Sequence, residues 1–158
     1  MSNGDVLDIL LVEDSDEDAE LIVRALRKSC LIHTPIRVRD GLQALEYVYR
    51  EGEYKNRPEA LPELILLDLK MPRVDGHEVL RTLKSDALTK SIPIVVITAS
   101  AQERDLLQSY KLGATGYLIK PVSFGAFAEA VTQAGLYWAI MRREANRLPT
   151  QPRTDTQT

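Results

Sequence analysis

The chain has 158 residues, of which 44% are apolar and 27% are charged, an ordinary composition for one globular domain. This composition excludes an extensively disordered or collagen-like chain, and the net charge of −3 argues against a module that binds nucleic acid by neutralising phosphates. The single Cys cannot form an intrachain disulfide, and no apolar run approaches the roughly 20 residues that cross a bilayer. Because the N-terminus also lacks a charged and then apolar leader, we expect a cytoplasmic protein that binds neither nucleic acid nor a membrane.

Four short apolar runs, rich in branched residues, are typical of strands that are covered on both faces. They are Val6–Val12, Leu64–Leu69, Ile92–Thr98 and Gly116–Lys120. A weaker run, Ile36–Arg39, has strand character as well. We therefore expect five strands.

Segments with the helical period of 3.6 residues follow these strands. They are Asp16–Ser29, Leu42–Tyr49, Asp75–Lys84, Glu103–Lys111 and a final helix that begins near Phe124. Ser15 is followed at three residues by Asp18, and Ser100 by Glu103, which is the spacing of a capping box. A strand and a helix thus alternate five times, which predicts an α/β fold with a parallel sheet, helices on both faces and right-handed crossovers.

Two polar segments do not fit this alternation. Glu51–Glu63 contains two prolines and is expected to form a long exposed loop before the third strand. Residues 146–158 are poor in apolar side chains and rich in Pro, Thr and Gln, which is typical of a disordered tail. Residues 1–145 are therefore expected to form a single domain.

Polar side chains stand where the predicted strands end. Glu13 and Asp14 follow the first strand, and Asp68 ends the third. Thr98 ends the fourth strand and Lys120 the fifth. Because ligands of open parallel sheets bind at the carboxyl ends of the strands, we expect these side chains to converge. A phosphate cannot enter so acidic a pocket without a cation, and Mg²⁺ suits the pocket because it prefers oxygen ligands and keeps waters that a phosphate can replace.

Each of these residues also has an ordinary structural interpretation when it is taken alone. Asp14 could be the N-cap of the following helix, Lys120 a surface lysine, and Thr98 a β-branched strand residue. Asp68 is different, because a carboxylate in a buried strand is costly unless it is paired or bound to a metal. The joint arrangement of polar residues at four strand ends favours a functional site.

Four motifs, in this order, resemble the receiver domain of two-component response regulators, the CheY-like family. They are LLVEDS at 10–15, LLDLKMPRVDG at 66–76, VITAS at 96–100 and GYLIKP at 116–121. The resemblance extends from about Leu7 to Gly135. It implies a flavodoxin-like (βα)5 fold, with a doubly wound parallel five-stranded sheet of order 2-1-3-4-5. It also implies a phosphoacceptor in signal transduction rather than an enzyme with a separate substrate.

The resemblance implies a role for each residue that matches these motifs. Asp68 would be the phosphoacceptor that takes a phosphoryl group from a histidine kinase, and Lys120 would pair with the phosphoryl oxygens. Asp14 and Asp68 would bind Mg²⁺ directly, and Glu13 would bind it through water. The backbone carbonyl of Lys70 would complete the metal site.

The resemblance further implies how phosphorylation is transmitted. Thr98 would be the switch hydroxyl that turns toward the new phosphoryl group, and Tyr117 would be the aromatic switch residue. The Lys120–Pro121 peptide bond would be cis, which an X–Pro bond adopts at modest cost.

The final helix carries apolar side chains beyond the expected end of the receiver fold, which favours a partner interface over simple core packing. These side chains belong to Leu136, Tyr137, Trp138, Ile140 and Met141. Because closed two-fold symmetry is the commonest form of self-association, we expect a homodimer through this helix. With the GEYKNRP loop and the absence of an output domain after Gly135, the helix resembles single-domain response regulators of bacterial phytochromes. The expected sensor histidine kinase is therefore a bacteriophytochrome.

Three other classes of protein remain as alternatives. A phosphatase of the haloacid-dehalogenase type needs a second acid two residues after the nucleophile, where this chain has Lys70. A flavodoxin-like cofactor carrier needs a phosphate-binding loop after the first strand, where the sequence EDSDED repels phosphate. A receiver-like scaffold that is not phosphorylated is disfavoured because Asp14, Asp68, Thr98 and Lys120 are all present.

Overall fold

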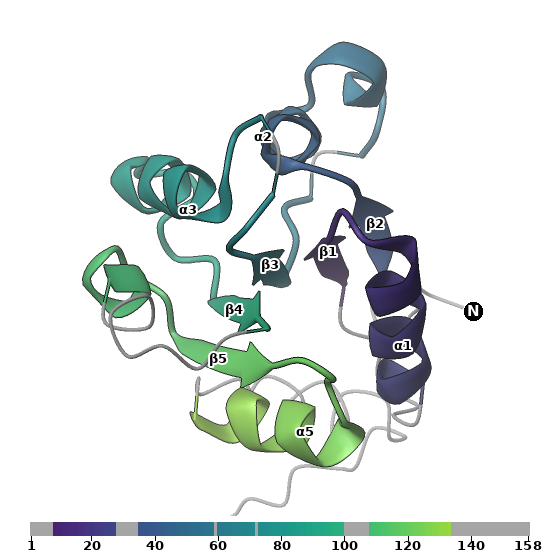
Figure 1. Ribbon diagram of the computed structural model, residues 1–158. Helices are drawn as coiled ribbons and strands as arrows, with labels where there is room; N and C mark the ends of the chain where they lie inside the picture. Colours follow the sequence, from purple (N-terminus) through teal and green to yellow (C-terminus); the bar gives the residue numbers. More distant parts are fainter. Residues whose placement is uncertain (1–7, 28–34, 59, 72, 100–107, 134–158) are drawn as a thin grey trace, which may run out of the picture.

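The computed structural model describes residues 8–27, 35–58, 60–71, 73–99 and 108–133 (Figure 1). Within them, five parallel strands form one sheet in the order β2-β1-β3-β4-β5. The strands are β1 (Ile9–Val12), β2 (Ile36–Val38), β3 (Leu64–Asp68), β4 (Ile94–Thr98) and β5 (Gly116–Ile119). This order confirms the predicted flavodoxin-like α/β fold, and it places the point where the strand order reverses between β1 and β3.

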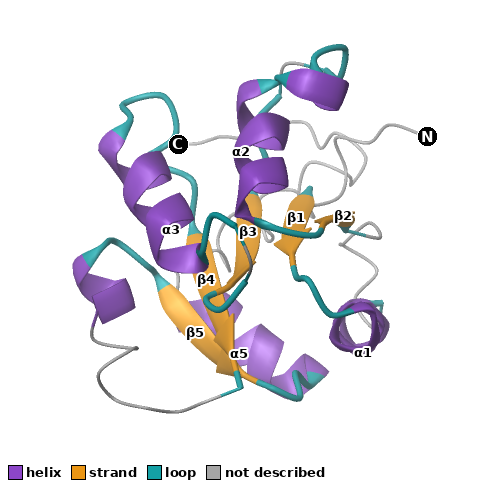
Figure 2. Ribbon diagram, turned by 45° about the horizontal axis from the view of Figure 1, so that its top comes forward, coloured by secondary structure: helices purple, strands orange, loops and turns teal. Residues whose placement is uncertain are grey.

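Helices cover both faces of the sheet, as Figures 1 and 2 show. They are α1 (Asp16–Leu26), α2 (Gly41–Tyr49), α3 (Gly76–Ser85), α5 (Phe124–Gln133) and the short 3-10 helix η2 (Gly52–Tyr54). α1 and α5 pack on one face of the sheet, and α2 and α3 pack on the other. Of the helix predicted at Glu103–Lys111, residues 108–111 are helical and the rest lies outside the described residues. No helix in the described ranges is long and apolar enough to span a membrane.

Several element boundaries differ from the sequence prediction by one to three residues, as at the start of β4 and the end of α1. β4 begins at Ile94 rather than at Ile92, because Pro93 between them has no N–H to donate to the ladder. α1 ends at Leu26, with Arg27 as its C-cap, so it is shorter than the predicted helix that ended at Ser29. The apolar pattern thus begins before the first residue of β4, and the helical pattern continues beyond the last residue of α1.

The predicted loop Glu51–Glu63 is mostly exposed, but it is not without structure. It contains η2, and Arg57 fastens it to the end of α2. The Arg57 guanidinium donates to the carbonyl oxygens of Tyr47 at 2.6 Å and Val48 at 3.2 Å, and it lies 4.2 Å from the centroid of the Tyr47 ring. The last carbonyls of α2 thereby gain the partners that a helix end needs.

The hydrophobic core lies on both sides of the sheet, because alternate strand residues point to opposite faces. In β3, Leu64 and Leu66 pack with α1 and α5, whereas Ile65 and Leu67 pack with α2 and α3. Every residue of β3 is buried, which explains its continuous apolar sequence. Burying one such side chain is worth about 1.5–3 kcal/mol, so both core layers favour a single register of the strand ends.

Candidate functional site

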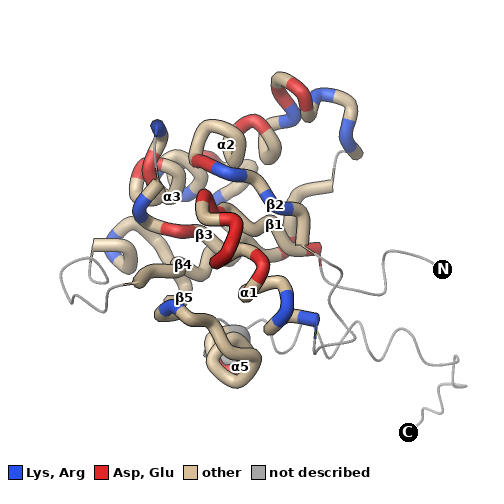
Figure 3. The backbone as a smooth tube through the Cα atoms, turned by 45° about the vertical axis from the view of Figure 1, so that its right-hand side comes forward, with Lys and Arg blue, Asp and Glu red and all other residues tan. Residues whose placement is uncertain are grey.

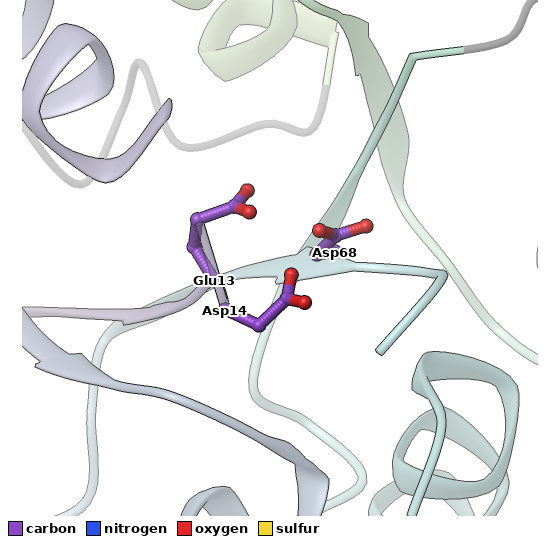
Figure 4. A group of neighbouring side chains, drawn as sticks. All are labelled: Glu13, Asp14 and Asp68. Carbon is purple, nitrogen blue, oxygen red and sulfur yellow. The ribbon is translucent and has the colours of Figure 1, made fainter. Parts of the chain in front are cut away.

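The register of the parallel sheet brings the predicted polar residues to one edge. β1 pairs with β3, so that Glu13, one residue past the end of β1, comes close to Asp68, the last residue of β3. β4 pairs with both β3 and β5, which brings Thr98 and Lys120 to the same edge. Figure 4 shows Glu13, Asp14 and Asp68 grouped where β1 and β3 end. The convergence that the strand ends predicted is therefore present.

Three carboxylates make the centre of this site strongly acidic. One oxygen each of Glu13, Asp14 and Asp68 lies within 4.8 Å of the others. Glu13 is fully buried and Asp68 is 4% exposed, whereas Asp14 is exposed. Figure 3 shows how the acidic residues continue from this edge into the start of α1. Like charges this close repel one another, so the group needs positive charge to be stable.

Lys120 supplies positive charge to this group. Its Nζ lies 2.9 Å from Glu13 Oε1 and 3.1 Å from Asp68 Oδ2. A third carboxylate, that of Asp18 on α1, places Oδ2 at 3.0 Å from the same nitrogen. The sequence prediction assigned Asp18 to the capping box and missed this contact. The available signal was its position three residues into a helix that starts beside the acidic strand end.

The electrostatics of the site follow from burial and pairing. Burial raises the pKa of the Glu13 carboxyl to about 7, against the opposing effect of the hydrogen bond from Lys120, and the charge of Asp68 adds to the rise. For Lys120, burial alone would lower the pKa of the ammonium. The hydrogen bonds to Glu13 and Asp18 and the charge of Asp68 outweigh burial and raise that pKa above its ordinary value. Lys120 therefore stays cationic at every physiological pH.

The residues at this edge fit a hard divalent cation. They offer three carboxylate oxygens within a few ångströms of one another, which is the donor type that Mg²⁺ prefers. The carboxylates of Glu13, Asp18 and Asp68 share the single ammonium of Lys120, so a divalent cation would balance negative charge that this ammonium leaves. Lys70 lies next to the group, because its backbone N–H donates to Asp68 Oδ1 at 3.0 Å. The use of the Lys70 carbonyl as a ligand stays a prediction.

The start of α1 corrects one structural interpretation of the acidic pair. Asp14 is not the N-cap of α1. Ser15 holds that position, and its Oγ accepts the N–H of Asp18 at 3.1 Å. The Ser15 N–H in turn donates to Glu13 Oε2 at 3.1 Å. The Asp14 carboxylate is therefore not used to cap the helix, and it lies with those of Glu13 and Asp68.

The loop between β3 and α3 is held by close backbone contacts. A Cβ on Gly76 would lie 2.3 Å from the carbonyl oxygen of Asp68, and a Cβ on Gly41 would lie 1.9 Å from that of Val74. Only glycine allows the two helix starts to approach the loop this closely. The Arg73 side chain also donates to Asp40, the N-cap of α2, with Nε 3.1 Å from Oδ2. These contacts position the loop that carries Lys70.

A cavity of about 170 Å³ opens at this edge of the sheet. Its lining residues are Asp14, Ser15, Asp18, Asp68, Lys70, Thr98, Ala99 and Lys120. Thr98 is 2% exposed and lines this cavity. Tyr117 is instead 40% exposed, and its ring contacts that of Tyr110 edge to face, with centroids 6.4 Å apart. The Lys120–Pro121 bond is cis, as the resemblance implied.

Part of the sequence prediction falls on residues that the structure does not describe. The second capping box, Ser100 with Glu103, is among them, and so is the proposed interface of the final helix. That interface comprises Leu136, Tyr137, Trp138, Ile140 and Met141. The described part of α5 ends at Gln133.

Comparisons with known proteins agree with the motifs. The family model of the response regulator receiver domain matches residues 9–132. Response regulator Rcp1 of Synechocystis sp. is 42% identical over 130 residues, which are 82% of this chain and 87% of Rcp1. A manganese-bound structure of response regulator Rcp1 has a TM-score of 0.68 at 39% identity, covering 91% of this chain and 99% of that one.

Two further solved structures carry names that refer to phytochromes. The bacteriophytochrome response regulator RtBRR has a TM-score of 0.78 at 42% identity, and the match covers 90% of this chain and 92% of RtBRR. The phosphorylated cyanobacterial phytochrome response regulator RcpA has a TM-score of 0.68 at 40% identity, covering 86% of this chain and 94% of RcpA. With the family model matching most of the chain and these relatives far above 30% identity, the chain belongs to the response regulator receiver domain family, whose members are signalling proteins.

Proposed function

We propose that this response regulator accepts a phosphoryl group on Asp68 from a sensor histidine kinase, in a reaction that needs Mg²⁺. The setting of Asp68 carries the proposal. Its carboxylate ends a buried strand and lines the cavity, with Oδ2 beside the Lys120 ammonium and Oδ1 on the Lys70 N–H. Glu13 is fully buried and Asp14 is exposed. A phosphoryl donor can therefore reach the Asp68 carboxylate through the cavity, and the Lys120 ammonium lies beside it.

The side chains of the site account for the transfer. A carboxylate oxygen of Asp68 attacks the phosphorus in line with the P–N bond of a phosphohistidine, which breaks as its electron pair leaves with the imidazole. An acyl phosphate forms on Asp68. Lys120 neutralises charge that develops on the phosphoryl oxygens. When bound by Asp14 and Asp68, with Glu13 and the Lys70 carbonyl completing the site, Mg²⁺ supplies further positive charge against these oxygens.

Thr98 and Tyr117 are the proposed reporters of this event. A phosphorylated side chain carries about −1.5 to −2 charges at pH 7, and Thr98 lies in the wall of the same cavity. Tyr117, three residues before Lys120, is half in solvent beside Tyr110. A rotation of both side chains would convert the new charge into a change of the surface around β5, where a partner protein can read it.

A phytochrome is the proposed kinase, and the final helix is the proposed dimer interface. RtBRR and RcpA, each at least 40% identical to this chain, are by name phytochrome response regulators, which supports the first proposal. Five large apolar side chains between residues 136 and 141 support the second.

Treatment with acetyl phosphate and Mg²⁺, followed by mass spectrometry, tests the phosphoacceptor. We expect one hydrolytically labile phosphate, on Asp68, and none in Asp68→Asn. Asp75→Asn is the matched control, because Asp75 caps α3 at the end of the same loop and Asn caps equally well. An unchanged yield of phosphate in Asp68→Asn would show that Asp68 is not the acceptor.

Phosphotransfer from a panel of purified histidine kinases, phytochromes included, tests the donor. We expect the phytochromes to transfer phosphate to this chain within seconds to minutes and other kinases to do so far more slowly. Equal transfer from unrelated kinases would refute the phytochrome assignment without affecting the role of Asp68.

A further inference from the structure

Asp18 makes only half of the capping box that the sequence predicted. Its backbone N–H donates to Ser15 Oγ at 3.1 Å, as expected. In a complete box its carboxylate would return to the Ser15 N–H. That N–H instead donates to Glu13 Oε2 at 3.1 Å, and the Asp18 carboxylate turns to Lys120, with Oδ2 3.0 Å from Nζ. The side chain is therefore used for a contact at the functional site.

This contact occupies the last hydrogen-bond donor of Lys120. An ammonium has three N–H groups, and here they go to Glu13, Asp68 and Asp18. The side chains of Glu13 and Asp68 are 0% and 6% exposed, whereas that of Asp18 is 37% exposed. Asp18 also lines the cavity in which Lys120 lies. It is thus the outermost of the three carboxylates and the one that solvent can most readily replace.

We propose that Asp18 is a positioning residue that competes with incoming phosphoryl oxygens for Lys120 and thereby slows phosphorylation of Asp68. This inference rests on the proposed function of Asp68. A phosphoryl group that enters the cavity needs an N–H of Lys120, and one of these is held toward α1 by Asp18. The charge of Asp18 at the cavity wall also opposes the approach of an anion.

Asp18→Asn tests this role, because Asn has the same shape but no charge. We expect phosphorylation of Asp68 by acetyl phosphate to be about fivefold faster, the size of effect that a partly exposed charged contact supports. Asp18→Glu keeps the charge and is expected to restore a rate near that of the wild-type protein. Glu17→Gln is the matched control, since it removes the same charge from the same helical turn, and the described residues show no ion pair of Glu17. We expect its rate to stay within about twofold of the wild-type rate.

A second background separates contact with Lys120 from a general effect of charge. In Lys120→Met, the additional change Asp18→Asn should leave the rate of phosphorylation unaltered. A readout that needs no metal is urea unfolding in EDTA. There, Asp18→Asn should shift the midpoint in the wild-type background and not in Lys120→Met.

Two outcomes would overturn the inference. One is a rate for Asp18→Asn that is no higher than that of Glu17→Gln. The other is an acceleration by Asp18→Asn of the same size with and without Lys120. Failure of the proposed function is distinct, because it would appear as absence of phosphate on Asp68 in the wild-type protein itself.

Discussion

Replacement of Lys120 by Met tests whether the ammonium holds the acidic site together in the absence of a divalent cation. The substitution keeps most of the length of the side chain but removes the only cation within 3.1 Å of both Glu13 and Asp68 among the described residues. Both carboxylates are almost fully buried, so solvent cannot take over the lost contacts. We expect the folded state to lose stability.

The size of the loss follows from burial and from the protonation of Glu13. Removing one partner of a buried ion pair costs about 3–5 kcal/mol, whereas the contact with the partly exposed Asp18 adds little. Glu13, with a pKa already raised from 4.5 to about 7, takes up a proton and relieves part of the cost. At a pH about one unit above 7 we therefore expect a loss of about 3 kcal/mol in free energy of unfolding.

The loss should depend on pH with a definite sign. Without Lys120, the pKa of Glu13 in the folded state rises further above its unfolded value, so the folded state binds more protons than the unfolded state. The free energy of unfolding of Lys120→Met therefore falls as pH rises from 4.5 to above 7. Its difference from the free energy of unfolding of the wild-type protein shrinks as pH falls below 7.

Urea unfolding in EDTA, at several pH values, measures these quantities, with the exposed Lys55→Met as control. Addition of Mg²⁺ should recover part of the stability of Lys120→Met, because a bound cation replaces the missing charge. A loss below about 1 kcal/mol, or one that is independent of both pH and Mg²⁺, would refute this account of the site.

Three further predictions concern the metal, the loop after β3 and assembly. Asp14→Ala should weaken Mg²⁺ binding together with phosphorylation, and a Mg²⁺ titration that gave wild-type affinity would contradict its role as a ligand. Gly76→Ala puts a Cβ 2.3 Å from the Asp68 carbonyl oxygen. It should lower the free energy of unfolding in urea by at least about 1–3 kcal/mol and slow phosphorylation. Unchanged stability would mean that the loop shifts to accommodate the Cβ without cost. Replacing Trp138 and Ile140 by polar residues should give a folded monomer that is still phosphorylated on Asp68, as judged by sedimentation. A wild-type protein that sediments as a monomer at micromolar concentration, with or without phosphate, would exclude the dimer.

The element order and the location of the site were predictable from the sequence alone. Strand and helix periods are local properties, and the alternation of five strands with helices admits few sheet topologies. In a parallel sheet the residue after each strand necessarily lies at the carboxyl edge. Glu13, Asp68, Thr98 and Lys120 could therefore be assigned to one site before their distances were known. The four motifs then indicated the family.

The partners of each side chain were decided by the tertiary structure. Lys120 and Asp18 are 102 residues apart in sequence, and they meet because α1 and the end of β5 lie at the same edge of the sheet. The sequence pattern around Asp18 predicts a helix start in either case, whether the Asp18 carboxylate accepts from the Ser15 N–H or from Lys120. The choice depends on Glu13, whose burial beside Ser15 occupies the N–H that Asp18 would otherwise bind. Local spacing determines which residues form an element, but the packing of distant elements determines which charges neutralise one another.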